Sequence, residues 1–174
     1  MVLDSLSAGD RAQLQELYAR SVLLPELKRL GEWVELFEPQ ATFRCIQAGA
    51  GRIVELRFTG RDELLSLGER ISGGRFDVAV GDLAQASHLR HVISNLCLFE
   101  GGTSRASGIA QVGVLSIAER EPRWIASGTY TDELHKCGAG CWRFLSRKFV
   151  PDGATAASTG QARTTGFPRP VTLA

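Results

Sequence analysis

The sequence predicts one α+β domain, in which about three helices pack against a cone-shaped, curved and mostly antiparallel sheet that encloses a pocket. Helical spacing of apolar residues is confined to the first part of the chain, and four stretches rich in β-branched and aromatic residues follow one another after residue 88. Helices first and strands last is the order typical of α+β domains. A length of 174 residues suits a single domain with its own core.

Three helices are expected before residue 72. Ser7 with Asp10 is a suitable helix start, and apolar residues then recur at helical spacing, so the first helix is expected over residues 7–24. Pro25 lacks a backbone donor, so the chain is expected to break or kink there. A second helix is expected from Gly31 until Pro39 ends it, and a third over residues 61–71.

Six strands are expected. Two cover residues 41–46 and 53–58, and four cover 89–99, 104–117, 124–135 and 142–150 with short turns between them, as in an antiparallel meander. Glycines punctuate an expected loop between residues 73 and 85. The domain is therefore expected to span residues 1–152, and residues 153–174, rich in small and polar residues, are expected to form a loop or lid.

Composition argues against several partners. The formal net charge is +1, with 20 basic residues scattered among 19 acids, so binding to nucleic acid is not expected. Asp4 and Asp10 stand where a signal peptide would carry positive charge, and no segment has the length of a membrane span. A cytoplasmic location is expected, with all four cysteines reduced and Cys137 and Cys141 as two thiols beside a turn.

His91 is the leading candidate for chemistry, because the unperturbed pKa of histidine, about 6.5, suits proton transfer near neutral pH. Strand alternation places Asn95 on the same face as His91. His88 and His91 would point to opposite faces, which argues against a shared metal. His135, near a hairpin tip, is expected to be solvated. From the residues alone, a structural hydrogen bond is the competing interpretation of His91.

Several short motifs in this order resemble the SnoaL-like branch of the nuclear-transport-factor-two-like superfamily. They are GEW at 31–33, FTGR at 58–61, RHVISN at 90–95, GTYTDE at 128–133 and CWRF at 141–144, followed by Arg147. The resemblance covers about residues 6–152 and implies the cone-shaped fold with a pocket. Members of this branch include scytalone dehydratase, hexachlorocyclohexane dehydrochlorinase, polyketide cyclases and β subunits of ring-hydroxylating dioxygenases.

The resemblance also implies site residues. In the dehydratase and dehydrochlorinase members a histidine on the first long meander strand pairs with a carboxylate after the first helix. His91 matches the histidine, and Glu26 falls where the family pattern has aspartate. Tyr130 and Tyr18 are candidates to polarise a substrate oxygen or to form part of the pocket wall. The other residues expected in that wall are Trp33, Phe43 and Asn95. The arginines at 90, 143 and 147 are expected at the surface or between subunits.

The expected function is that of a cofactor-independent lyase or isomerase, resembling a dehydratase or cyclase, acting on a small apolar cyclic substrate. The alternatives are a non-catalytic β subunit of a ring-hydroxylating dioxygenase and a ligand-binding protein. No metal, nucleotide or flavin is expected, because no phosphate-binding glycine loop or ligand cluster is apparent. The resemblance makes a homo-oligomer, a dimer or trimer, the expected assembly.

Overall fold

The computed structural model describes residues 6–49, 52–73, 89–117, 122–138 and 140–152. The predicted loop at 73–85 from residue 74 on, His88 and the predicted tail at 153–174 lie outside the described residues. The described elements are α1 (Ala8–Glu26), α2 (Leu30–Val34), β1 (Phe37–Gly49), β2 (Arg52–Thr59), α3 (Gly60–Ser72), β3 (Leu89–Glu100), β4 (Arg105–Ser116), β5 (Arg123–Lys136) and β6 (Trp142–Pro151).

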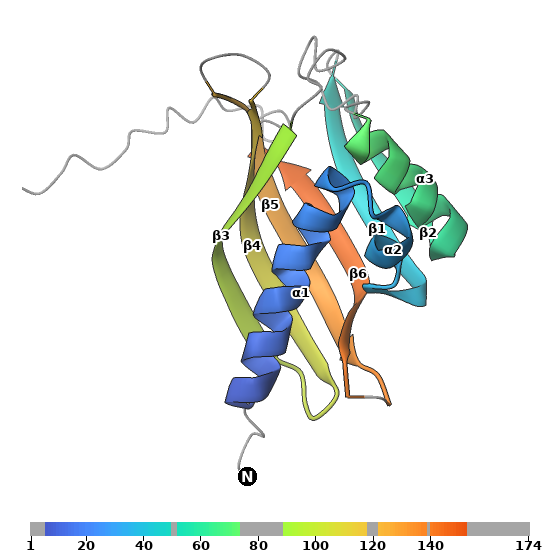
Figure 1. Cartoon of the computed structure of the whole chain (residues 1–174), viewed down its shortest axis with the longest axis vertical. Coiled ribbons are helices and arrows are strands. Elements are labelled where there is room, and N and C mark those ends of the chain that lie inside the picture. Colours follow the sequence, from blue (N-terminus) through green and yellow to red (C-terminus); the bar gives the residue numbers. More distant parts are fainter. Residues whose placement is uncertain (1–5, 50–51, 74–88, 118–121, 139, 153–174) are drawn as a thin grey trace, which may run out of the picture.

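The strands form one curved, open sheet in the order β2-β1-β6-β5-β4-β3. Only the β1–β6 pair is parallel among the described strand pairs. Figure 1 shows α1 lying along the face of the sheet over the β3–β6 meander, with α3 beside β1 and β2. The predicted fold class is therefore confirmed.

The break predicted at Pro25 comes slightly later than expected, because α1 includes Pro25 and ends at Glu26. A proline in this position cannot donate to the carbonyl of Ser21, four residues earlier. The indole Nε1–H of Trp33 donates to that carbonyl instead, at 2.9 Å. The missing backbone bond is thus replaced by a side chain from α2, which also ties α2 to α1.

The helix predicted up to Pro39 is also shorter than expected. α2 ends at Val34, and the chain enters β1 at Phe37, so Pro39 lies within a strand. The register between β1 and β6 shifts between Phe37 and Thr42. Proline is tolerated in strands at such irregular positions, because the sheet needs no hydrogen bond from its nitrogen there.

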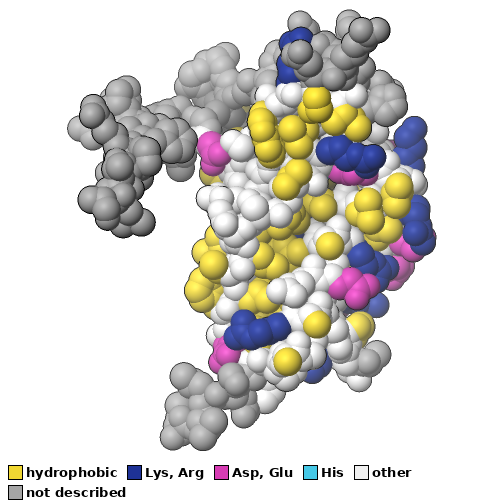
Figure 2. All heavy atoms as spheres, turned by 60° about the vertical axis from the view of Figure 1, so that its left-hand side comes forward, with side chains coloured by type: hydrophobic (Ala, Val, Ile, Leu, Met, Phe, Trp, Pro, Cys, Tyr) yellow, Lys and Arg dark blue, Asp and Glu magenta, His cyan; other side chains and the backbone are white. Residues whose placement is uncertain are grey.

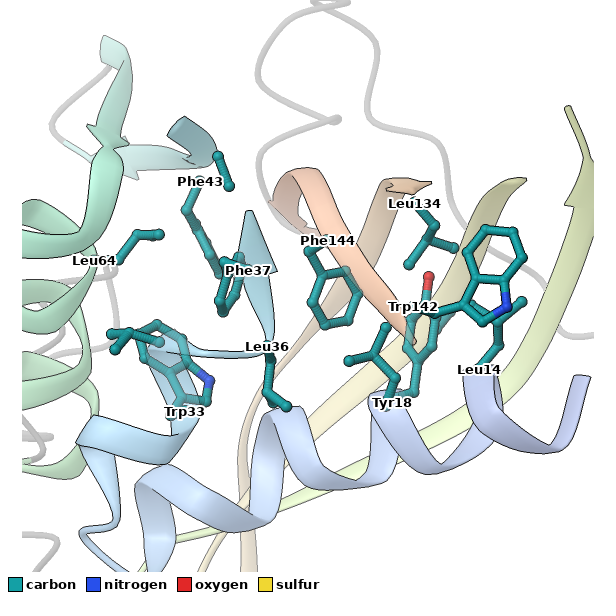
Figure 3. Packing of buried hydrophobic residues seen from close by; sticks show 14 of the residues in the cluster. Leu14, Tyr18, Trp33, Leu36, Phe37, Phe43, Leu64, Leu134, Trp142 and Phe144 are labelled. Carbon is teal, nitrogen blue, oxygen red and sulfur yellow. The ribbon is translucent and has the colours of Figure 1, made fainter. Parts of the chain in front are cut away.

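The core lies between α1 and the sheet, as Figure 3 shows. Tyr18 packs edge-on against Phe144 with ring centroids 5.4 Å apart, and Trp33 packs against Phe37 at 5.0 Å. These aromatic contacts fix the height and direction of α1 over the sheet. They therefore decide where the last residue of α1, Glu26, meets β3.

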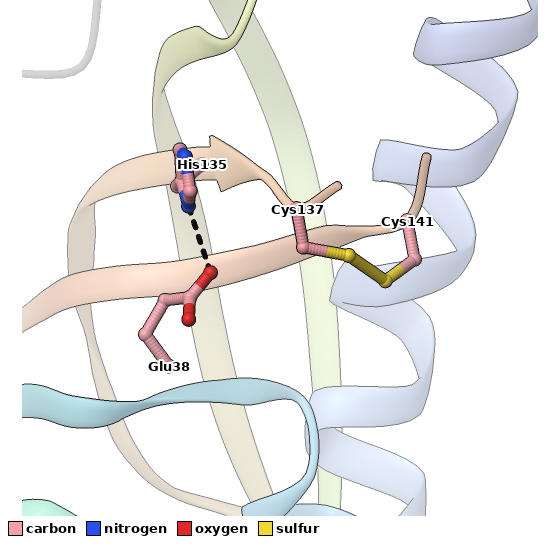
Figure 4. Close-up of a disulfide and its surroundings, with 4 residues drawn as sticks. All are labelled: Glu38, His135, Cys137 and Cys141. Carbon is pink, nitrogen blue, oxygen red and sulfur yellow. Dashed lines mark hydrogen bonds and ion pairs between the residues drawn. A yellow bond between two sulfur atoms is a disulfide. The ribbon is translucent and has the colours of Figure 1, made fainter. Parts of the chain in front are cut away.

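The hairpin between β5 and β6 corrects the expectation of four reduced cysteines. Cys137 and Cys141 form a disulfide across its turn (Figure 4), whereas Cys45 and Cys97 are free. The turn brings the two Cα atoms to 5.5 Å, within the range that a disulfide spans. His135, expected to be solvated, is instead paired through Nδ1 with Glu38 Oε1 at 2.8 Å.

Charged side chains on the face drawn in Figure 2 alternate in sign, with basic groups beside acidic ones. Within the described ranges, no helix has the length and apolar character needed to cross a lipid bilayer. The predicted cytoplasmic location stays a prediction.

Candidate active site

A partly enclosed cavity lies between the C-terminal half of α1 and the inner face of the sheet. The volume open to the centres of water-sized molecules is about 80 Å³, several times the space needed for one water. Its polar lining residues are Ser21, His91, Tyr130 and Arg147. The rest of the wall is aliphatic and aromatic, namely Val22, Pro25, Trp33, Phe43, Ile71, Leu89, Val112, Val114, Ala126 and Phe149.

The structure brings Glu26 and His91 together at one wall of this cavity. Glu26 Oε1 accepts a hydrogen bond from the backbone N–H of His91 at 2.5 Å and lies 3.2 Å from the ring Nδ1. The other carboxylate oxygen, Oε2, accepts from the Arg90 guanidinium at 2.8 Å. The Glu26 and His91 side chains are only 7% and 14% exposed, so their interaction is shielded from solvent.

The surroundings of Glu26 favour its charged form. Burial raises the pKa of the Glu26 carboxyl, but hydrogen bonds from the His91 ring, the His91 backbone and Arg90 outweigh burial and lower the pKa below its ordinary value. A carboxylate at Nδ1 favours the tautomer that carries its proton there. Nε2 is then the ring atom available to a molecule in the cavity.

Tyr130, on β5, contributes a phenol to the cavity. Its ring is packed between Phe43 and Phe149, with centroid separations of 6.4 and 5.5 Å. Burial raises the pKa of Tyr130 to about 12. The phenol therefore stays protonated near neutral pH and can act as a hydrogen-bond donor.

The predicted wall residues divide into two groups. Trp33 and Phe43 line the cavity. Tyr18 does not: it is buried in the core, and its hydroxyl lies against Gly108. Asn95 does not line the cavity either, since its side chain is exposed and donates to Gln111 Oε1 at 2.5 Å.

The alternation prediction for Asn95 is wrong because β3 contains a bulge. The register between β3 and β4 shifts between Ser94 and Cys97, and Asn95 has a φ of 50°. One extra residue in a strand reverses which side chains face inward. Leu96 and Leu98, rather than Asn95, consequently continue the half-buried face that begins at Leu89.

Sequence reasoning missed a buried ion pair at the wall of the cavity. Arg147, expected at the surface, is 1% exposed and binds Asp132, also 1% exposed, through two hydrogen bonds of 2.9 Å. Its third contact is Ser21 Oγ, at 2.9 Å. The signal was present in the alternation of β5, which places Asp132 on the same face as Tyr130 and Leu134.

Among the described side chains, no three of His, Cys, Asp and Glu come close enough together to hold a metal ion. His88, weighed with His91 as a metal ligand, lies outside the described residues.

The fold and this cavity define an α+β protein with a curved sheet, an internal cavity and a histidine–carboxylate pair. The sequence model of the SnoaL-like domain matches residues 7–148. The chain therefore belongs to the SnoaL-like domain family. No curated protein matches the sequence significantly.

Solved structures share the fold at low sequence identity. An NTF2-like protein with a cystatin-like fold from Novosphingobium aromaticivorans is 20% identical, with a TM-score of 0.63 over 86% of this chain and 87% of that one. The protein LinA is 18% identical, with a TM-score of 0.63 over 83% and 86%. A protein provisionally named scytalone dehydratase, also from N. aromaticivorans, is 19% identical, with a TM-score of 0.59 over 82% and 83%.

Proposed function

We propose that the protein is a cofactor-independent lyase or isomerase that moves a proton on a small apolar cyclic substrate, with His91 as the base. The observation that carries this proposal is the Glu26–His91 pair, which is nearly buried and lies at a cavity whose wall is mostly apolar. Mostly apolar pockets with a few polar groups are the usual form of small-molecule sites. The match to the SnoaL-like domain and the fold likeness to the protein provisionally named scytalone dehydratase support this class of reaction.

The proposed step begins with a substrate C–H bond beside a carbonyl group. His91 Nε2 takes the proton, and the C–H electron pair moves into the adjacent bond to form an enolate. Glu26 stabilises the imidazolium through Nδ1–H. Tyr130 donates a hydrogen bond to the carbonyl oxygen, where negative charge develops.

The enolate can then react in one of two ways. In an elimination it re-forms the carbonyl and expels a neighbouring hydroxyl, which takes the proton from His91 and leaves as water. In an isomerisation the substrate is a β,γ-unsaturated ketone, and the proton returns to the γ-carbon of the dienolate as the double bond moves into conjugation with the carbonyl. Both outcomes balance without an external oxidant or reductant.

The first test is hydrogen exchange, because it needs no knowledge of the leaving group. The protein is incubated in D2O with a panel of small cyclic ketones and β-hydroxy ketones, and deuterium incorporation is followed by mass spectrometry. We expect catalysed exchange with at least one member of the panel. His91→Gln is expected to reduce its rate by at least about 100-fold, a typical contribution of a general base.

The chain supplies a matched control. His135 also pairs through Nδ1 with a glutamate, Glu38, but its side chain does not line the cavity. His135→Gln should keep the exchange rate within about twofold of the unmodified protein. Binding of panel members without exchange would overturn the proposal in favour of a ligand-binding protein.

A further inference from the structure

Glu26 occupies a position that is unfavourable for an acid. It is the last residue of α1, where the helix dipole places partial negative charge, and the last turn of α1 contains no basic residue. Its carboxylate is also nearly buried. A negative charge in such a place requires a compensating cation from outside the helix.

Arg90 supplies that cation from the next element. Its Nη1 lies 2.8 Å from Glu26 Oε2, and its own side chain is 53% exposed. Among the described cations nearer in sequence to Glu26, Arg29 is bound to Glu32 by two hydrogen bonds of 2.6 Å, and no ion pair joins Lys28 to Glu26. Arg90 therefore both neutralises Glu26 and covers it from solvent.

The place of β3 in the sheet explains how neighbouring residues reach one carboxylate. β3 is an edge strand, and edge strands leave outward backbone donors free of ladder bonds. At this edge Glu26 Oε1 accepts a hydrogen bond from the backbone N–H of His91. Glu26 Oε2 accepts a hydrogen bond from the Arg90 guanidinium, which comes from the other face of the strand. Each oxygen thus has its own partner.

This division of partners determines the orientation of the carboxylate. The terminal torsion of a glutamate side chain is broad and holds no orientation by itself. With Oε2 held by Arg90, Oε1 is directed at both the backbone N–H and the ring Nδ1 of His91. Without Arg90, Oε1 could keep the backbone bond while the carboxylate plane turned away from the ring.

We propose that Arg90 is a positioning residue, which holds Glu26 in the orientation that keeps the proton of His91 on Nδ1 and leaves Nε2 free toward the cavity. This inference rests on the proposed function, since it assigns Arg90 a part in preparing the base. Arg90 itself does not line the cavity.

The test is the ring 15N spectrum of histidine-labelled protein at about pH 8, where the shifts of Nδ1 and Nε2 distinguish the two neutral tautomers. In the unmodified protein we expect His91 to carry its proton on Nδ1. In Arg90→Met we expect a shift toward the tautomer protonated on Nε2, and in Arg90→Lys a smaller shift, because Lys keeps the charge without the planar fork. Arg57→Met, which removes an exposed arginine from β2, should leave the spectrum unchanged.

The His135 signals serve as an internal reference for folding. If Arg90→Met does not fold, Arg90→Gln replaces it, with the same expectation. Unchanged His91 ring shifts in folded variants would overturn the positioning role and leave the proposed function standing. The spectrum needs no substrate, so it is independent of whether His91→Gln loses exchange activity.

Activity provides a second readout. In the exchange assay, Arg90→Met should lower kcat by about 10- to 100-fold, as expected from misplacement of a reacting group. KM should change by less than about threefold, because Arg90 does not touch the cavity. A rise in KM with unchanged kcat would overturn the positioning role.

Discussion

Asp132 and Arg147 form an ion pair with two hydrogen bonds on the inner face of the sheet, with Nε to Oδ1 and Nη2 to Oδ2 both at 2.9 Å. The guanidinium also lies over aromatic rings, 3.9 Å from the Phe144 centroid and 4.3 Å from that of Tyr130. Burial lowers the pKa of the Arg147 guanidinium, but the Asp132 charge outweighs it and raises the pKa. The pair therefore stays ionised at the wall of the cavity.

Breaking this pair should destabilise the protein strongly. Asp132→Asn leaves an uncompensated charge on a buried guanidinium, for which the expected loss in unfolding free energy is about 3–5 kcal/mol. Replacing both residues, as Asp132→Leu with Arg147→Met, should recover much of that loss, since apolar side chains need no partner. Urea denaturation followed by circular dichroism measures both.

The surface offers a control of the same geometry. Arg29 and Glu32 also form two hydrogen bonds, of 2.6 Å each, but their side chains are 54% and 48% exposed. Glu32→Gln should cost less than about 1 kcal/mol. If Asp132→Asn and Glu32→Gln lowered the unfolding free energy equally, burial would not make an arginine depend more strongly on its carboxylate partner.

The contact between Tyr18 and Gly108 gives a second prediction. The Tyr18 hydroxyl is buried without a hydrogen-bond partner of good geometry among the described residues, so Tyr18→Phe should change the unfolding free energy by less than about 1 kcal/mol. A Cβ at Gly108 would come within 2.2 Å of that hydroxyl oxygen. Gly108→Ala should therefore cost about 1–3 kcal/mol.

The two substitutions should be coupled. Once the hydroxyl is removed, the nearest Tyr18 atom to a Cβ at Gly108 is the ring carbon Cζ, at 3.1 Å. Gly108→Ala should then cost at least about 0.5 kcal/mol less in the Tyr18→Phe background. Strictly additive losses in denaturant titrations would contradict this account of the contact.

Much of the fold could be predicted because the determining signals are local. Apolar spacing and short turns located α1, α3 and the meander strands to within about two residues, as is usual for strongly periodic segments. The errors at Pro25 and Pro39 have a tertiary cause. The Trp33 indole replaces the bond that Pro25 cannot make, and a register shift accommodates Pro39, so neither could be seen from local propensity.

The candidate site was predictable only in part. The family resemblance predicted that Glu26 and His91 pair, and the two side chains are in contact; Trp33 lines the cavity as predicted. The inward placement of Asn95 failed, because a bulge is defined by the partner strand and not by the sequence of β3 alone. Arg147 was misplaced for a related reason: a buried charge is recognised only with its partner, and Asp132 lies on a neighbouring strand.

The disulfide at the β5–β6 turn gives a third prediction. Reducing it, or replacing Cys137 and Cys141 by serine, should lower the unfolding free energy by about 2 kcal/mol, at the low end of the usual range because the closed loop is short. Thermal unfolding with and without dithiothreitol measures the effect. The serine double variant should not respond to the reductant.

Thiol counting provides the complementary measurement. Denatured, unreduced protein should show two reactive thiols, from Cys45 and Cys97, out of four cysteines. Four reactive thiols in protein handled without reductant would contradict the pairing of Cys137 with Cys141.

Asp10 joins the start of α1 to the β5–β6 hairpin and gives the last prediction. Its Oδ1 lies 2.7 Å from Lys136 Nζ and accepts from the Trp142 indole at 2.8 Å, and Oδ2 accepts from Ser7 Oγ at 2.7 Å. The hydrogen bond from Lys136, followed by those from Ser7 and Trp142, holds the pKa of Asp10 well below its usual range. Asp10 is therefore expected to stabilise the folded state mainly in its charged form.

The sign of the pH dependence follows from that lowered pKa. In the unfolded chain Asp10 should titrate near its ordinary pKa of about 3.9, so its stabilisation is complete above that pH and is lost as the pH falls toward the lower folded pKa. The difference in unfolding free energy between the unmodified protein and Asp10→Asn should be constant from about pH 5 to pH 8 and shrink below about pH 4. Glu16→Gln, which removes an exposed acid from the same helix, controls for the change in net charge. A difference for Asp10→Asn that stays the same from about pH 8 down to about pH 3 would mean that the carboxylate charge contributes nothing to docking the hairpin on α1.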